Sequence, residues 1–318
     1  MSGKPLSPSR QVVFHQMLVA ARKGALMDAL SEALGQLDPN VTKKQILAYG
    51  GQKILAAAGI RDEHVFPVPA VLEKKPTLVG YYRLLLGISQ KRFYRKGTEM
   101  GPFKSMETRG VFNAKKRPDL ERFCTVMSEN LAELVRQISP KITARDVSEL
   151  PLLTLGAQLY GSNNNAIGKQ ATLDVFLSVV EIVKKFIVSR DSTKIIVHNA
   201  SKRKVIIALS SDPDIRIQEE FEGKLRNILA IEIKGGTDVS NAHNRAGEAE
   251  KSHRKAKKQD FRDYWTIISL AGVDPTMLQQ ESPTTNSWFD VAQVLAREGD
   301  DWREFRSRFA GAVGIPLG

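Results

Sequence analysis

The stretch LAIEIKGGTD, residues 229–238, places two opposite charges inside an apolar run that ends in two glycines. Successive side chains of a β-strand point to opposite faces, so Glu232 and Lys234 share one face while Ile231 and Ile233 share the other. Charged groups are rarely buried in a strand unless a partner compensates them. The stretch therefore predicts a strand whose charged face has a function.

A second segment, PDIRIQ at residues 213–218, alternates apolar and polar side chains as a strand does. If the two segments pair as a hairpin, Asp214 and Glu232 converge at one edge of the sheet, with Lys234 beside them. Two neighbouring carboxylates repel each other, and a divalent cation removes that cost. Hard oxygen ligands suit Mg²⁺, and the backbone carbonyl of Ile233 is a further candidate ligand.

Lys234 is the candidate for the chemical step beside such a metal. An ammonium group there can orient a water, lower its pKa or neutralise charge on a pentacovalent phosphorus. The two glycines that follow leave room for a nucleic-acid backbone. The alternative interpretation is a partly exposed Glu–Lys pair on an edge strand, because E-x-K alone is common. The Pro-Asp on the preceding strand and the shared face favour the metal site.

Pro213-Asp214 and Glu232-Ile233-Lys234 together resemble the motif of the PD-(D/E)xK nucleases. That resemblance implies an α/β (α+β) fold, a restriction-endonuclease-like core in which helices flank a central mixed β-sheet. It also implies Mg²⁺-dependent hydrolysis of phosphodiester bonds. In that activity Asp214 and Glu232 would bind the metal, and Lys234 would assist the nucleophilic water.

Two further residues are candidates for the same site. Members of the superfamily often add an acidic residue from the helix before the first strand, and Glu181 occupies that position here. An ordinary polar stripe along the helix is the alternative for Glu181. His243, on the helix expected after the Glu232 strand, could contact the scissile phosphate or a base. It could equally be a plain residue of the first helical turn.

The longer segment EIKGGTDVSNAHNRAGEAEKSHRKA, residues 232–256, resembles type II restriction endonucleases of the XcyI group. This resemblance spans most of the chain, including YYRLLLGISQKRFY at residues 81–94. It implies the recognition site CCCGGG, cut after the first cytosine. More distantly, the E-x-K-G-G-x-D start is similar to BsoBI, whose matching stretch carries a histidine on the following helix. His243 is the nearest match to that histidine, at a different spacing.

The rest of the chain suggests three regions. Residues 1–150 have mainly helical periodicity. Residues 151–275 begin with a polar loop, GSNNNAIGKQ, and continue as a helix, three or four adjacent strands, a helix and a strand. That order is typical of a mixed sheet in an α/β or α+β core. Residues 276–318 look irregular, with one final helix.

Basic residues gather in two clusters that are candidates for DNA contact. Residues 91–117 hold nine Lys or Arg and two acidic residues, a local charge of +7 in a chain whose net charge is +12. Phe93, Tyr94 and Phe103 are interleaved with them. Such clusters neutralise phosphates, and arginine can read guanine in the major groove. The DNA-binding candidates are Lys91, Arg92, Arg95, Lys96, Lys104 and Arg109, followed by Lys251, Arg254 and Lys255.

Composition limits the class of protein. A net charge of +12 favours a polyanionic partner. The single cysteine, Cys124, excludes a disulfide framework, suits a reducing cytoplasm and is expected in the core. No uninterrupted apolar run reaches about 18 residues, so a membrane span is not expected. The chain has no G-x-x-x-x-G-K phosphate loop, which argues against a nucleotide cofactor.

These observations favour a cytoplasmic type II restriction endonuclease that protects its host against foreign DNA. It would cut both strands of a palindromic, G·C-rich duplex as a Mg²⁺-dependent homodimer, since two-fold symmetry in the protein matches a palindrome. Arg92, Arg95 and Arg109 are candidate guanine readers. The alternatives are a repair or recombination nuclease without sequence specificity and a non-catalytic DNA-binding protein. The latter would leave Lys234 without a purpose.

Overall fold

The structure is a computed structural model that describes residues 9–46, 50–138, 142–235 and 242–317. The chain divides into two compact units, residues 1–162 and residues 163–318. The long helix α10 (Ala144–Val183) contains the boundary between them. The boundary predicted near residue 150 therefore falls inside a helix.

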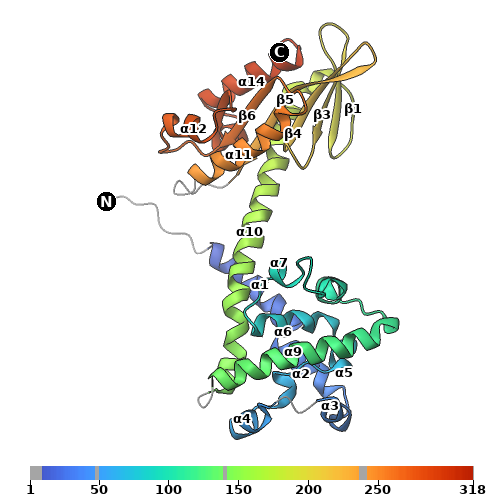
Figure 1. The fold of residues 1–318 in the computed structure, drawn as a ribbon. Coiled ribbons are helices and arrows are strands. Elements are labelled where there is room, and N and C mark those ends of the chain that lie inside the picture. Colours follow the sequence, from blue (N-terminus) through green and yellow to red (C-terminus); the bar gives the residue numbers. More distant parts are fainter. Residues whose placement is uncertain (1–8, 47–49, 139–141, 236–241, 318) are drawn as a thin grey trace. The chain divides into compact units, whose positions relative to one another are not determined.

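The first unit is built from helices, as its periodicity predicts (Figure 1). Its core is formed by apolar side chains from most of these helices, and Leu120, Phe123, Met127 and Leu131 of α9 lie fully inside it. Its elements are α1 (Ser9–Ala25), α2 (Met27–Gly35), α3 (Pro39–Gln45), α4 (Gln52–Ala57), η1 (Asp62–His64), α5 (Pro69–Lys74), η2 (Pro76–Leu78), α6 (Val79–Leu85), α7 (Gln90–Phe93), η3 (Gly101–Phe103), α8 (Lys104–Arg109), η4 (Ala114–Lys116), α9 (Arg117–Ile138) and the first part of α10.

The chain's one cysteine lies in this core. Cys124 is on α9 and is buried, as expected from the apolar periodicity of that helix. Burial raises the pKa of its thiol well above the ordinary value, because the thiolate would lose its hydration. Cys124 is therefore a packing residue and not a nucleophile.

The second unit contains a seven-stranded sheet whose order follows the sequence, β1 to β7. Strands β1 to β5 pair antiparallel, whereas β5, β6 and β7 pair parallel, so the sheet is mixed as predicted. The strands are β1 (Ile187–Arg190), β2 (Lys194–His198), β3 (Lys204–Leu209), β4 (Ile215–Phe221), β5 (Lys224–Lys234), β6 (Asp263–Ile268) and β7 (Ser287–Asp290). The other elements are η5 (Lys184–Phe186), α11 (Ala242–Lys257), α12 (Pro275–Glu281), α13 (Val291–Ala296) and α14 (Asp300–Val313).

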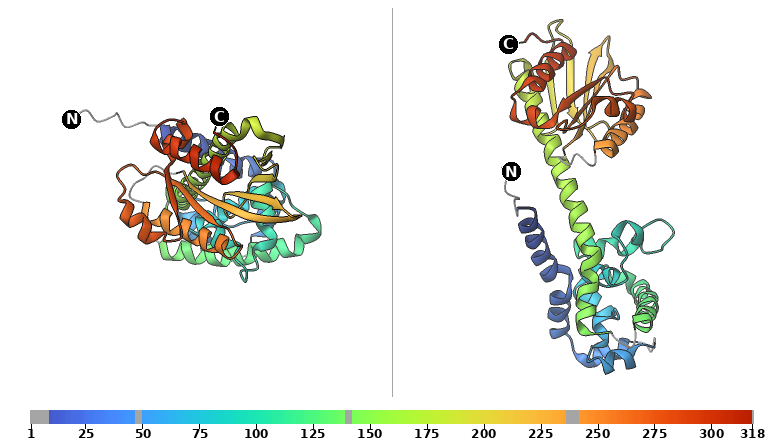
Figure 2. Two further views of the ribbon diagram at one scale, coloured as in Figure 1. Left: turned by 90° about the horizontal axis from the view of Figure 1, so that it is seen from above. Right: turned by 90° about the vertical axis from the view of Figure 1, so that its left-hand side faces the viewer.

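Helices cover both faces of this sheet (Figure 2). On one face, Leu229, Ile231 and Ile233 of β5 join the core formed with the second part of α10 and with α14. On the other face, Ala230 packs with Ala256 of α11. The alternation along β5 thus gives each face of the strand a different neighbour, and it directs Glu232 and Lys234 toward the α11 side.

Two segments differ from the sequence-based expectation. Residues 161–170 were expected as a polar loop, but they are helical within α10. Asn and Gly disfavour a helix by only about 1 kcal/mol or less per residue, so the helical turns on either side override them. Residues 276–318 were expected to be irregular apart from one final helix. That helix is α14, but the region also supplies strand β7 and helix α13. Phe289 and Phe305 from this part are fully buried in the core of the sheet.

Candidate active site

Strand pairing brings the two motif carboxylates, Asp214 and Glu232, together at the start of β4. Ile215, the first residue of β4, is paired with Ile231 of β5, so the preceding Asp214 falls opposite Glu232. The Asp214 carboxylate accepts a hydrogen bond from the backbone N–H of Ile233, at 2.8 Å from Oδ2. Asp214 thus lies beside the strand that carries the E-x-K motif, as the hairpin interpretation predicts.

Lys234 is oriented by the acidic side chains around it. Its Nζ donates to Glu232 Oε1 at 2.8 Å and lies 3.8 Å from Glu248 Oε2 of α11. The Lys234 and Glu232 side chains are only 19% and 9% exposed, which makes this a largely desolvated ion pair. Since screening by water is weak at such a site, the charges act strongly on one another.

The pKa values of the cluster reflect its crowding. Burial, followed by the charge of Glu232, raises the pKa of Asp214 to about 6. Burial alone would lower the pKa of Lys234, but the charge and hydrogen bond of Glu232, together with Asp214 and Glu248, raise it above its ordinary value. The lysine is therefore an ammonium ion near neutral pH and acts as a cation rather than as a base.

The donor set fits a hard divalent cation. The N–H and C=O of one strand residue point to the same side, so the Ile233 carbonyl points to the side on which its N–H meets Asp214. Asp214, Glu232 and this carbonyl offer oxygen donors only. Within the described residues, no group of three His, Cys, Asp or Glu side chains is arranged to hold a metal ion. Mg²⁺ is commonly bound by one or two carboxylates and waters, so the pair suffices for it.

Sequence reasoning missed Asp212, Glu248 and Ser252, which lie around this cluster. Ser252 of α11 donates to Glu232 Oε2 at 2.7 Å and also hydrogen-bonds Asp212, which in turn pairs with Lys255. Glu248 lies on the same helix. The available signal was spacing, because residues 248, 252 and 255 recur at the period of one helix face. Nothing local, however, indicates that this face meets the motif.

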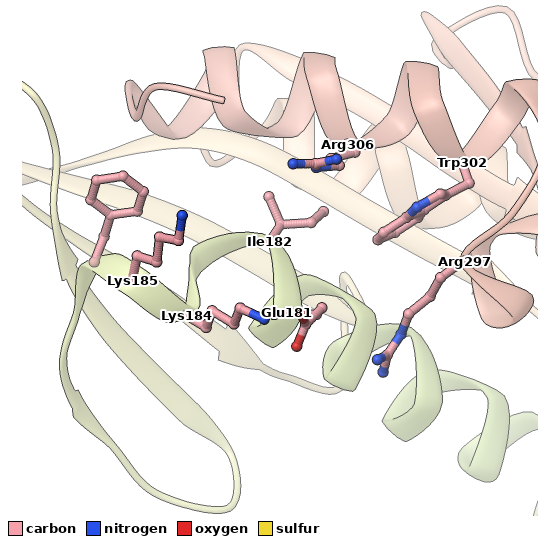
Figure 3. A pocket seen from close by; sticks show the side chains of 8 residues that line it. Glu181, Ile182, Lys184, Lys185, Arg297, Trp302 and Arg306 are labelled. Carbon is pink, nitrogen blue, oxygen red and sulfur yellow. Dashed lines mark hydrogen bonds and ion pairs between the residues drawn. The ribbon is translucent and has the colours of Figure 1, made fainter. Parts of the chain in front are cut away.

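Glu181 is not brought together with the other candidates. It lies in the last turn of α10, ten residues after Ala171, whose Cβ adjoins Gly235 at the end of β5. A rise of 1.5 Å per residue puts it about 15 Å further along the helix. Its carboxylate pairs with Lys184 in a cavity of about 470 Å³, with Trp302 and Arg306 of α14 on the other wall (Figure 3). Glu181 thus lies on the sheet face opposite to α11.

The two histidines of α11 differ in their surroundings. His243 is 61% exposed, and its Nδ1 lies 3.3 Å from Glu281 Oε1 of α12. Among the described residues, it makes no contact with Asp214, Glu232 or Lys234. His253 is fully buried and meets Thr266 Oγ1 through Nε2 at 2.9 Å. Burial lowers the pKa of His253 to about 4, so this ring is neutral.

The first basic cluster is an exposed surface of the first unit. Its six candidate residues are exposed, namely Lys91, Arg92, Arg95, Lys96, Lys104 and Arg109. Two of the interleaved aromatics, Phe93 and Phe103, are buried against Phe123 of α9. They anchor the segment to the core instead of facing a ligand. Phe93 is the last residue of α7 and Phe103 the last residue of η3, and each is the buried residue of its short helix.

A buried carboxylate joins the parts of this surface. Glu107 of α8 accepts hydrogen bonds from Arg83 of α6 at 2.8 and 3.1 Å, from Gln90 at 3.0 Å and from Tyr94 at 2.6 Å. The Arg83 and Glu107 side chains are 2% and 9% exposed. A Cβ on Gly80 would come within 3.1 Å of Glu107, so the glycine makes room for it. The Glu107 carboxylate thus holds α7 and α8, which carry basic residues of this surface, to one another and to α6.

The second basic cluster is partly neutralised. Arg254 pairs with the buried Glu250 at 2.6 Å, and Lys255 pairs with Asp212. Lys251 is exposed, and no ion pair of it appears among the described residues. Lys255, which was predicted as a DNA contact, thus pairs with a carboxylate two residues before Asp214.

Comparison with known proteins identifies the family. The family model of the XcyI restriction endonuclease matches residues 15–316. The type II restriction enzyme Cfr9I of Citrobacter freundii is 38% identical over 315 residues, covering 97% of this chain and 96% of that protein. The type II restriction enzyme XcyI of Xanthomonas campestris pv. cyanopsidis is 39% identical over 316 residues, covering 97% and 95%. The chain therefore belongs to the XcyI restriction endonuclease family, whose members are enzymes that cleave DNA.

Proposed function

We propose that the protein is a Mg²⁺-dependent endonuclease that cuts both strands of a palindromic G·C-rich duplex as a homodimer. The observation that carries the proposal is the carboxylate pair Asp214 and Glu232, which shares one edge of the sheet with Lys234. The site CCCGGG, cut after the first cytosine, rests on the resemblance to the XcyI group. Its role would be to protect the host against foreign DNA in the cytoplasm.

Each residue of the site would have a separate role in the reaction. Asp214, Glu232 and the Ile233 carbonyl would hold the ion. The bound ion would supply Lewis-acid stabilisation of the attacking and leaving oxygens in an in-line displacement at phosphorus. Lys234, as an ammonium ion, would donate a hydrogen bond to the attacking water or to a phosphate oxygen. Gly235 follows directly, and its lack of a side chain lets Ala171 of α10 pack against the end of the strand.

The exposed basic surface around α7 and α8 supports DNA as the partner. Each lysine or arginine that neutralises a phosphate releases a counterion, so binding would weaken steeply as salt rises. Arg92, Arg95 and Arg109 are proposed to read guanines, because arginine can bond the O6 and N7 atoms of guanine together. The described residues contain no helix that is long and apolar enough to cross a membrane.

One digestion tests this proposal. Unmethylated plasmid is incubated with the protein and Mg²⁺, and the ends of the products are sequenced. Discrete fragments whose ends show cleavage after the first cytosine of the site, C|CCGGG, support it, whereas a smear would indicate a nuclease without sequence specificity. Binding without cleavage in Mg²⁺ would leave only a DNA-binding protein. The Asp214→Ala variant must be inactive in the same assay.

A further inference from the structure

Five side chains form a continuous chain of contacts beside the motif. Lys255 pairs with Asp212, Asp212 meets the Ser252 hydroxyl, and that hydroxyl lies 2.7 Å from Glu232 Oε2. Glu232 Oε1 then accepts from Lys234 at 2.8 Å. A lysine stands at each end of this chain, a carboxylate lies next to each lysine, and one neutral hydroxyl lies between the two carboxylates. Lys234 and Glu232 belong to the predicted motif, whereas the other three do not.

The hydroxyl of Ser252 is shared by two carboxylates. A serine hydroxyl has one proton and can donate it to one acceptor at a time. Both Asp212 Oδ1 and Glu232 Oε2 lie within hydrogen-bond distance of Oγ. Ser252 is 7% exposed and Glu232 is 6% exposed, so water has little access to replace it. Without the hydroxyl, the buried Glu232 carboxylate and the half-buried Asp212 carboxylate would have no donor between them, which is unfavourable.

One face of α11 supplies these contacts. Glu248, Ser252 and Lys255 follow one another at intervals of four and three residues, so they lie on the same side of the helix. They meet Lys234, Glu232 and Asp212 respectively. The helix is held close to the sheet by small buried side chains, among them Ala249 and Ala256. A rigid element therefore sets the position of all three partners.

We infer that Ser252 is a positioning residue for Glu232, and that the Asp212–Lys255 ion pair supports Ser252 from the other side. The inference rests on the proposed function, because it assigns Glu232 to the metal. With Lys234 on one oxygen and Ser252 on the other, the Glu232 carboxylate has a single orientation. Removal of a group that orients a metal-binding carboxylate typically lowers metal affinity or activity by about 10- to 100-fold.

The test compares Ser252→Ala with Ser252→Thr. Two quantities are measured, namely the affinity of the DNA-free protein for Mn²⁺ by calorimetry, and kcat and KM for cleavage as Mg²⁺ is varied. Ser252→Ala should weaken Mn²⁺ binding and lower kcat by about 10- to 100-fold, with KM for DNA unchanged. Ser252→Thr, which keeps the hydroxyl, should recover most of both. Ser128→Ala is the matched control, because Ser128 is buried and its Oγ has no hydrogen-bond partner in the described part of the chain.

A second variant keeps the inference testable if Ser252→Ala fails to fold. The Lys255 side chain is 64% exposed, so Lys255→Met is compatible with folding. It should weaken Mn²⁺ binding in the same direction, and Lys257→Met on the same helix should not. The inference is overturned if Ser252→Ala or Lys255→Met matches its control in Mn²⁺ affinity and kcat, or if Ser252→Thr is as impaired as Ser252→Ala. An active Asp214→Ala variant would instead overturn the proposed function itself.

Discussion

The carboxylate of Asp214, directly before the first residue of β4, accepts a hydrogen bond from the backbone N–H of Ile233 near the end of β5, 2.8 Å away. One contact thus fixes the acidic side chain against the strand that carries Glu232 and Lys234. It also directs the Ile233 carbonyl to the same side as Asp214. The five predictions below follow from this arrangement and from the basic surface of the first unit.

Asp214→Asn separates the charge of this residue from its hydrogen bond. The amide oxygen can still accept from Ile233, so the local structure should persist, but one of two negative charges is lost. Since a metal ion supplies several kcal/mol of stabilisation in such reactions, cleavage should fall at least about 1000-fold. Single-turnover cleavage in Mg²⁺ measures this, with DNA affinity in Ca²⁺ expected to stay unchanged. Cleavage within tenfold of wild type would remove Asp214 from the site.

The raised pKa of Asp214 predicts how pH affects the response to metal. Because its folded pKa is about 6 against an ordinary 3.8, this group stabilises the metal-free fold below pH 3.8, and that contribution is lost as pH rises through about 6. A cation can bind without displacing a proton only above that range. Mg²⁺ should therefore raise Tm more at pH 8 than at pH 5, as thermal denaturation would show. Asp214→Asn should abolish the difference, and equal shifts in the wild type would contradict it.

Arg95→Ala tests the exposed basic surface. Removal of one phosphate contact should weaken binding to any duplex and reduce the slope of log K against log salt by about 1. Removal of a guanine contact should instead weaken binding mainly to the cognate site. Fluorescence anisotropy across a salt series separates the two outcomes. Arg145→Ala, an exposed arginine outside the surface, is the control, and identical curves for both variants would take Arg95 out of the interface.

Glu107→Gln tests the point that fastens this surface. The change leaves the buried Arg83 without its charged partner, which typically costs about 3–5 kcal/mol of folding stability. Tyr94→Phe removes only one hydrogen bond and should cost about 1 kcal/mol. Glu107→Gln should also lower DNA affinity, measured in Ca²⁺, because it removes the charged group that α7 and α8 share, whereas Tyr94→Phe keeps the bond between Gln90 and Glu107 and should lower it less. The exposed Glu99→Gln is the matched control, and full DNA affinity in Glu107→Gln would show that the fastening is dispensable.

Glu181→Gln tests a residue that the superfamily pattern suggested. Its carboxylate pairs with Lys184 on the sheet face opposite to α11. As a surface substitution distant from the carboxylate pair, it should change kcat by no more than about twofold. Steady-state cleavage is sufficient as the measurement. A loss comparable to that of Asp214→Asn would return Glu181 to the site and would imply a different arrangement of α10 when DNA is bound.

The sequence was sufficient for the strands and their phase but not for what packs on them. Alternation has a period of two, so LAIEIK specified which side chains share a face, and the order of elements specified a mixed sheet. The pairing of Asp212 with Lys255 spans 43 residues and has no local signal. Ser252 was passed over for the same reason, because its partners come from the turn before β4 and from β5.

Misread segments were those in which local preference and tertiary packing disagree. The run of asparagines at residues 163–165 favours a loop in isolation, yet it is helical within α10. Phe93 and Phe103 lie among basic residues in the sequence, but both are buried in the core, where each ring packs against Phe123. Strand β7 has four residues, which is too short for alternation to mark it.

Cys124 gives the protein a practical property. A maleimide reacts with a thiolate, and this thiol is buried with a raised pKa, so it should stay unlabelled near neutral pH. A cysteine introduced at an exposed position such as Lys91 or Lys251 would then be the one reactive thiol of the chain. Fluorophores or spin labels could be attached there without first deleting a native residue. Movements of either unit on binding DNA are thus open to direct spectroscopic measurement.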